Sequence, residues 1–169
     1  MSTIRRCGTE DFAAILSIVN AAAVAYRGVI PADQWHEPYM PADELAQEIA
    51  AGVVFWGVEQ DGRLTGVMGL QAVRDVDLIR HAYVLPADQR HGIGGALLRH
   101  LRAMSSRQML VGTWRAAEWA IRFYQRHGFE MVAPDTKQRL LATYWTVSPR
   151  QADVSVVLAD PPLRSMNIS

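Results

Sequence analysis

Residues 89–100 read QRHGIGGALLRH and place three glycines directly before a stretch whose apolar side chains repeat at helical spacing. Glycine disfavours a helix interior, so its use at this point needs a reason. At the start of a helix several backbone N–H groups lack internal partners, and the helix dipole adds partial positive charge. Glycines let the backbone approach an anion closely. The stretch therefore predicts an anion site, suited to phosphate, at the start of a helix over 94–104.

Two familiar nucleotide-binding loops do not fit these glycines. The ATP and GTP loop needs Gly-x-x-x-x-Gly-Lys-Ser/Thr, and no lysine in the chain is followed by a hydroxyl residue. The dinucleotide fingerprint needs Gly-x-Gly-x-x-Gly, but Leu97 stands in the third glycine's place when counting starts at Gly92. What remains is the pattern Gln89-x-x-Gly92-x-Gly94, directly after an extended segment that ends at Pro86.

Composition indicates an ordinary globular protein. The 169 residues suffice for one sizeable core, half of them are hydrophobic, and the net charge is zero, which points away from nucleic acid as a partner. Cys7 is the single cysteine, so we expect no internal disulfide, no metal site and no thiol nucleophile. No signal peptide is recognisable, and the longest apolar region, residues 12–26, is interrupted by Ser17 and Asn20. We therefore expect a cytoplasmic protein without a membrane span.

Periodicity and turn residues predict alternating strands and helices, hence one α/β domain over residues 1–160 with a frayed tail over 161–169. Thr9 is expected to cap the first helix, and Asp61-Gly62 is a strong hairpin signal. The long loop before the second helix is expected to be functional. The strands are expected at 3–6, 53–60, 63–73, 77–85, 108–114, 129–133 and 153–159, and the helices at 9–26, 43–51, 94–104, 116–127 and 137–145.

The glycine pattern resembles the acetyl-CoA loop of the GNAT superfamily of N-acetyltransferases, whose pattern is Gln/Arg-x-x-Gly-x-Gly/Ala. A second motif of that family, Ala-x-x-Phe-Tyr-x-x-x-Gly-Phe, follows one strand later. It is carried here by Ala120, Phe123, Tyr124, Gly128 and Phe129. Two motifs in the family's order are far more specific than one. The resemblance spans about residues 4–158.

The resemblance implies a GNAT fold, in which a central mixed, mostly antiparallel twisted sheet is flanked by helices on both faces. It also implies direct transfer of an acetyl group from acetyl-CoA, the co-substrate, to a primary amine. By position, the Val84 N–H would hold the thioester carbonyl, with Tyr83 and Leu85 along the pantetheine arm and the pyrophosphate on residues 89–95. The implied cofactor-binding residues are Tyr83, Val84, Leu85, Gln89, Arg90, His91, Gly92, Ile93, Gly94 and Gly95.

The resemblance assigns Tyr124 as the general acid. A phenol with a pKa of about 10 stays protonated at neutral pH and can protonate a thiolate whose conjugate acid has a pKa near 8.5. A base must also take a proton from the amine. His81, in a strand that should face the site, has a suitable side chain. Asp33, His36 and Glu37, in the loop before the second helix, are alternatives.

One departure from the family pattern is Ala117, which stands where many members carry an asparagine that helps anchor the cofactor or cap the helix. This departure and the lack of an obvious base keep a rival hypothesis open, a non-catalytic acyl-CoA-binding sensor or partner-docking module.

The acceptor is open between a small molecule, an antibiotic, a peptide terminus and a protein lysine. We favour a small-molecule amine, because aromatic and acidic residues before the second helix suit one. Those residues are Tyr26, Asp33, Trp35, Glu37, Tyr39, Met40 and Glu44. The closing TYWTV, residues 143–147, either mediates a homodimer or packs in the core.

Overall fold

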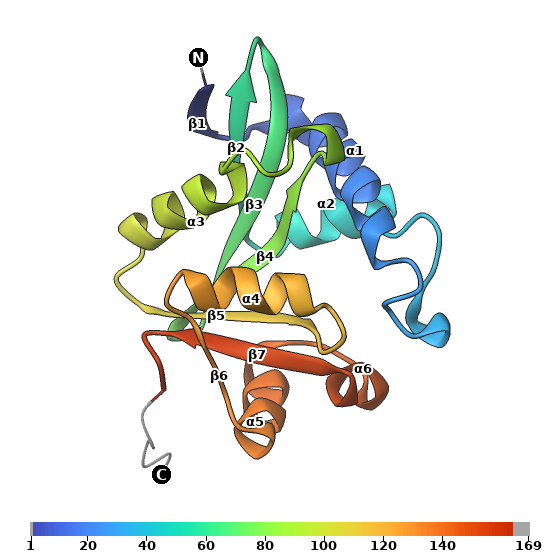
Figure 1. Cartoon of the computed structure of the whole chain (residues 1–169), viewed down its shortest axis with the longest axis vertical. Helices are drawn as coiled ribbons and strands as arrows, with labels where there is room; N and C mark the ends of the chain where they lie inside the picture. The colour runs from blue at the N-terminus through green and yellow to red at the C-terminus, as the bar shows by residue number, and fades with distance from the viewer. Residues whose placement is uncertain (1, 164–169) are drawn as a thin grey trace.

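The computed structural model describes residues 2–163 and contains a seven-stranded sheet in the order β1-β2-β3-β4-β5-β7-β6, with helices on both faces (Figure 1). All neighbouring strands are antiparallel except β4 and β5, which confirms the expected mixed, mostly antiparallel sheet. The strands are β1 (Ser2–Arg6), β2 (Val53–Gln60), β3 (Arg63–Val73), β4 (Val76–Val84), β5 (Gln108–Trp114), β6 (Glu130–Met131) and β7 (Ser155–Asp160). The helices are α1 (Phe12–Ala23), α2 (Ala42–Ala50), α3 (Ile93–Met104), α4 (Glu118–Arg126), α5 (Pro134–Tyr144) and α6 (Pro149–Asp153).

The hairpin between β2 and β3 turns at Asp61 and Gly62, as the sequence predicts. Both residues have positive φ, 52° and 79°, and Gln60 pairs with Arg63 across the turn. A two-residue turn with left-handed dihedrals matches the twist of the strands that it joins, which is why Asp-Gly is favoured there.

The predicted first helix is divided into a short 3-10 turn, α1 and a second 3-10 turn that ends at Tyr26. The prediction that Thr9 caps it is wrong. The turn begins at Thr9 with Gly8 as the preceding residue, and the Asp11 carboxylate accepts the Gly8 N–H at 2.8 Å. Asp11 also accepts two hydrogen bonds from the Arg5 guanidinium of β1, so the carboxylate ties the start of the helical segment to the sheet.

Two layers of core cover the opposite faces of the sheet. Adjacent strand residues point to opposite faces, so Ile79 packs with α3 and α4 whereas Leu78 packs with α5 and α6. A third cluster lies under α1 and α2 and contains Phe55 and Val67. Helix α3 therefore lies on the face opposite to α1 and α2.

Strands β4 and β5 separate partway along their length (Figure 1). Their parallel pairing runs from Val76 with Gln108 to Ile79 with Val111, and residues 2–163 contain no further pair between them. Beyond that point β4 stays paired with β3 as far as Val84, and β5 stays paired with β7. The split leaves one edge of β4 without a strand partner in the middle of the sheet.

The C-terminal region packs more extensively than the sequence predicts. Helix α6 was not expected, and Leu163, assigned to the frayed tail, packs against the core cluster that contains Leu78; residues 164–169 lie outside the described part. In the TYWTV stretch, Trp145 covers Gly112 and the Tyr144 hydroxyl donates to Asp75 at 2.6 Å, in line with the core-packing alternative. No helix within residues 2–163 has the length and apolar character needed to span a membrane.

Candidate active site

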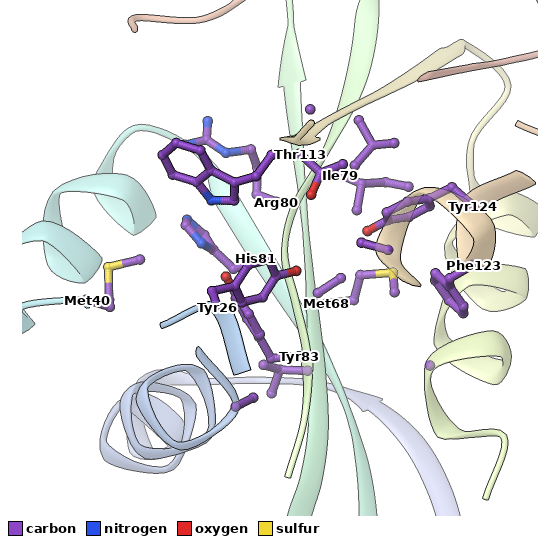
Figure 2. A pocket seen from close by; sticks show the side chains of 18 of the residues that line it. Tyr26, Met40, Met68, Ile79, Arg80, His81, Tyr83, Thr113, Phe123 and Tyr124 are labelled. Carbon is purple, nitrogen blue, oxygen red and sulfur yellow. The ribbon is translucent and has the colours of Figure 1, made fainter. Parts of the chain in front are cut away.

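The split between β4 and β5 opens into a cleft of about 1740 Å³. The start of α3 and the inner face of α4 line it on one side of the sheet, and the end of the α1 segment and α2 line it on the other. Figure 2 shows Phe123 and Tyr124 on one side of β4 and Arg80, His81 and Met40 on the opposite side. The cleft therefore reaches both faces of the sheet through the split.

The glycine stretch forms the turn into α3, where Gly92 is the N-cap residue with a left-handed φ of 78°. Within residues 2–163, the backbone N–H groups of Arg90, His91 and Gly92 donate no hydrogen bond, and those of the first helical turn have no partner inside the helix. A Cβ on Gly94 would lie at an ordinary contact distance, 3.5 Å, from the Phe123 ring, so Gly94 and Phe123 lie side by side where both line the cleft. The turn therefore presents unpaired backbone N–H groups at the start of α3, and its role as an anion site stays a prediction.

The side chains of the loop differ in what they offer. The Gln89 amide donates to the Val84 carbonyl at 3.1 Å and so ties the loop to the end of β4. The Ile93 side chain is buried in the core, which leaves only its backbone N–H for a ligand. Arg90 and His91 are exposed.

The Val84 N–H points into the split. Leu85 donates its N–H to the Thr65 carbonyl of β3, and consecutive residues of a strand direct their N–H groups to opposite edges. The Val84 carbonyl accepts from Gln89 instead of β3, which agrees with this orientation. One unpaired backbone donor therefore faces the cleft where the sequence analysis expects it.

Tyr124 lies in α4 and its side chain is 5% exposed, with its hydroxyl directed toward the split (Figure 2). Its ring packs edge-on against Phe123 and Phe129, at centroid distances of 5.1 and 5.6 Å. Burial, with a smaller contribution from Tyr26, raises the pKa of the Tyr124 phenol above its ordinary value. The phenol therefore keeps its proton at neutral pH, as a general acid requires.

Aromatic rings close the mouth of the split. Trp119, at the start of α4, contacts Tyr26 at 5.1 Å between centroids, and Tyr26 meets Tyr83 edge-on at 6.2 Å. Burial is the main cause that raises the pKa of Tyr26 to about 12. Tyr83 lines the cleft from the α1 side, whereas Leu85 packs into the core under α1. Of these two predicted cofactor contacts, only Tyr83 borders the cleft.

His81 occupies a β-bulge. The register of β3 and β4 shifts between Val67 and Gly69, so Met68 lies opposite two residues of β4, His81 and Ala82. His81 has a positive φ of 53°, which is unfavourable for a residue with a side chain. The extra residue turns the imidazole to the α2 side, whereas strict alternation after Arg80 would have directed it to the α3 side.

Glu48 of α2 meets the imidazole. Its Oε2 lies 2.7 Å from His81 Nε2, and its Oε1 accepts from the Arg80 guanidinium, which also donates to Gln71 at 2.9 Å. The Phe55 ring stacks on the imidazole at 6.2 Å. Burial alone would raise the pKa of the Glu48 carboxyl, but His81 and Arg80 hold it below its ordinary value.

The alternative bases already have partners. Glu37 pairs with Arg27, and Asp33 pairs with Arg150 of α6 at 3.1 Å. These exposed pairs anchor the segment between α1 and α2. The His36 Nδ1 lies 3.2 Å from the Pro38 carbonyl. The His81 side chain is 16% exposed, against 57% for Asp33 and 58% for Glu37, so His81 is the most buried of these three candidates.

Two smaller expectations concern Ala117 and Cys7. Ala117 is fully buried before α4 and makes no side-chain cap, so nothing at this position replaces the family's asparagine. Burial raises the pKa of the Cys7 thiol to about 11, so it remains protonated and is unsuited as a nucleophile.

Sequence reasoning missed Glu48, Arg80 and Trp119. Glu48 precedes its partner His81 by 33 positions along the chain, and an acidic residue on an amphipathic helix is ordinarily a solvated one. No local pattern signals such a pair. Only the position of α2 beside β4 brings the two side chains together.

The model of the acetyltransferase (GNAT) domain matches residues 51–131, which include both motifs up to Phe129. No curated protein matches the chain in sequence. Solved structures do match. The PaiA N-acetyltransferase from Thermoplasma acidophilum, in complex with coenzyme A, has a TM-score of 0.71 at 17% identity, with 94% of this chain and 98% of that chain covered.

Two further structures extend the comparison. The ribosomal-protein-S18-alanine N-acetyltransferase from Escherichia coli has a TM-score of 0.69 at 19% identity, with 100% of this chain and 99% of that chain covered. The yncA protein from Salmonella typhimurium, with its cofactor acetyl-CoA, has a TM-score of 0.60 at 27% identity, with 78% of this chain and 81% of that chain covered. These structures share the fold described above.

Proposed function

We propose that this chain, whose residues 51–131 match the model of the acetyltransferase (GNAT) domain, transfers an acetyl group from acetyl-CoA to a primary amine on a small molecule. One observation carries the proposal: the split between β4 and β5 joins the glycine turn of α3 to the buried Tyr124 within one cleft. An anion site for the cofactor and a protonated acid for the leaving sulfur are two of the groups that such a transfer uses.

The residues around the turn fit acetyl-CoA. The unpaired N–H groups from Arg90 to Gly95 and the helix dipole would hold the pyrophosphate, with the Arg90 and His91 side chains beside it. Gly94 and Phe123, which both line the cleft, would border the pantetheine arm. Bound acetyl-CoA supplies an activated acetyl thioester.

The remaining residues would stabilise the negative charge that develops on the acetyl oxygen and would transfer protons. The Val84 N–H would donate to the acetyl carbonyl oxygen, and a preorganised backbone donor of this kind is worth about 10²-fold or more in rate. The Tyr124 hydroxyl would donate its proton to the departing sulfur. His81, which lies on the side of β4 opposite to Tyr124 (Figure 2), would accept a proton from an amine that enters from that side.

A small acceptor is favoured by the segment between α1 and α2. Its Asp33–Arg150 and Arg27–Glu37 pairs hold it over that side, and its Tyr39 ring meets Tyr83 at 6.4 Å, which narrows the entrance with aromatic side chains. The neighbouring structures include ribosomal-protein-alanine N-acetyltransferases, so a peptide N-terminus is the acceptor class to test beside small amines. Homodimer formation stays a prediction.

The test is a calorimetric titration with acetyl-CoA of the wild type, Gly94→Glu and Gly94→Gln. The Cβ at this position has ordinary contacts, so both variants should fold. We expect binding by the wild type and the weakest binding by Gly94→Glu, whose carboxylate repels the cofactor phosphates. The Gly94→Gln variant has a side chain of equal size without the charge, so the comparison separates the effect of charge from the effect of size. Thiol release is then measured with small primary amines and an alanine-ended peptide.

The results separate the hypotheses. Thiol release with an amine supports the enzyme. Binding without release for every amine class supports the acyl-CoA sensor instead, and absence of binding by the wild type overturns the acetyl-CoA site.

A further inference from the structure

We propose that Glu48 is a positioning residue for His81: its carboxylate holds the imidazole Nε2, so that Nδ1 faces the acceptor amine as the proton acceptor. The inference rests on the proposed function, because it assigns a second residue to the base of that reaction. It does not follow from either sequence motif, since Glu48 and His81 lie outside both.

The two ring nitrogens have different surroundings. His81 Nε2 and Glu48 Oε2 are both buried and lie 2.7 Å apart, and neither atom has another partner within residues 2–163. Nδ1 is not among the buried unpartnered atoms and makes no hydrogen bond with a described residue. Neutral imidazole carries a proton on one nitrogen only, and the position of that proton follows the acceptor that it meets. The Glu48 carboxylate therefore selects the tautomer with Nε2–H, and the Nδ1 lone pair is left for the substrate.

The carboxylate is itself held in place. Its second oxygen accepts from Arg80, and Arg80 is fixed in turn by Gln71. Leu45, one turn earlier on α2, is fully buried in the core, which anchors the helix against the sheet. Glu48 therefore presents its carboxylate from a rigid element.

The β-bulge gives a second, independent indication. His81 keeps a left-handed φ although its neighbours in β4 are extended, and such backbone strain clusters at functional sites. Strict alternation would turn the imidazole toward the α3 side, away from Glu48. The strained conformation is what brings the imidazole to the carboxylate.

Several charged or titratable groups surround the imidazole. Glu48 and Arg80 face it directly, and Glu44, His36 and Tyr26 line the same cleft from the α1–α2 side. Arg80 neutralises part of the negative charge of Glu48 through its contact with Oε1, while Oε2 faces the His81 imidazole. When Nδ1 takes a proton, the carboxylate stabilises the resulting imidazolium.

The protons balance as follows. An acceptor ammonium gives one proton to Nδ1, and its nitrogen then bonds to the acetyl carbon as the carbon–sulfur bond breaks. The sulfur takes the Tyr124 proton, the nitrogen's second proton returns to the Tyr124 oxygen, and His81 releases its proton to solvent. The products are the acetylamide, the free thiol and one proton.

The experiment compares the wild type, Glu48→Gln and Asp43→Asn. Asp43 lies on the same helix, is exposed and does not border the cleft, so its variant removes an equal charge without touching His81. Nitrogen NMR of the imidazoles over a pH series reports the tautomer and the titration of His81 without any ligand. The pH profile of kcat/KM is measured on the same proteins.

We expect neutral wild-type His81 to carry its proton on Nε2. In Glu48→Gln the preference of neutral His81 for the Nε2–H tautomer should be reduced, because the charged acceptor that faces Nε2 is gone. At pH 7, kcat/KM should fall by about tenfold or more, as for other residues that orient a functional histidine. Asp43→Asn should match the wild type.

An Nδ1–H tautomer in the wild type, or an unchanged tautomer together with an unchanged kcat/KM in Glu48→Gln, would overturn the inference while leaving the acetyltransferase intact. A wild type that releases no thiol with any amine fails the proposed function instead, and the base role with it. The tautomer is measured on the wild type, so it decides the pairing even if Glu48→Gln does not fold.

Discussion

Replacing Tyr124 with phenylalanine should lower kcat by about 10²-fold, because the general acid is lost and such groups contribute about 10²–10⁴-fold. A 10²-fold loss corresponds to about 2.7 kcal/mol of barrier. The free energy of unfolding should change by less than about 1 kcal/mol. The ring contacts with Phe123 and Phe129 remain, and no hydrogen bond of the Tyr124 hydroxyl within residues 2–163 is broken.

The assay is steady-state thiol release at saturating acetyl-CoA, with acetyl-CoA affinity from calorimetry and stability from urea unfolding. Tyr26→Phe is the matched variant, since it also removes one buried phenol from the same cleft. We expect it to lose less than about tenfold in kcat, because Tyr26 lies at the mouth of the cleft against Trp119.

An unchanged kcat in Tyr124→Phe would refute the acid assignment. So would a loss of acetyl-CoA affinity that matches the loss of kcat/KM, since the hydroxyl would then serve binding. If Tyr26→Phe shows the larger loss of kcat, the proton donor is on the α1 side.

Two further predictions concern stability and reactivity. Because burial raises the pKa of Cys7 to about 11 from an ordinary 9.0, its alkylation by iodoacetamide at pH 8 should be about 100 times slower in the folded protein than in urea; equal rates would contradict this. Asp11→Asn should destabilise the fold by about 2–3 kcal/mol in urea unfolding, since the charged bonds to Arg5 and Gly8 are weakened. Arg5 lowers the pKa of the Asp11 carboxyl, so the unfolded state takes up the proton first as pH falls below about 4. The stability that Asp11 contributes is lost there, and Asp11→Asn should flatten that part of the pH curve.

The elements that sequence reasoning predicts correctly share short-range causes. The hairpin at Asp61 and Gly62 follows from two residues that tolerate left-handed dihedrals. The first-helix cap was missed because Gly8 has no side chain to signal it, and the capping carboxylate of Asp11 depends on Arg5 in a neighbouring strand. Such a cap has no local signature.

The glycine turn at Gly92, the strand before it and the helix that carries Tyr124 follow from the amino-acid order, because turn chemistry and side-chain periodicity act within a few residues. The separation of β4 from β5 and the meeting of His81 with Glu48 depend on the tertiary structure. The order of the strands in the sheet brings together side chains that are tens of positions apart in the sequence. The β-bulge directs His81 to the other face of the sheet, because one extra residue in a strand reverses the direction of a side chain. The side of the cleft proposed for the cofactor is thus determined by local sequence, and the side proposed for the acceptor is determined by long-range packing.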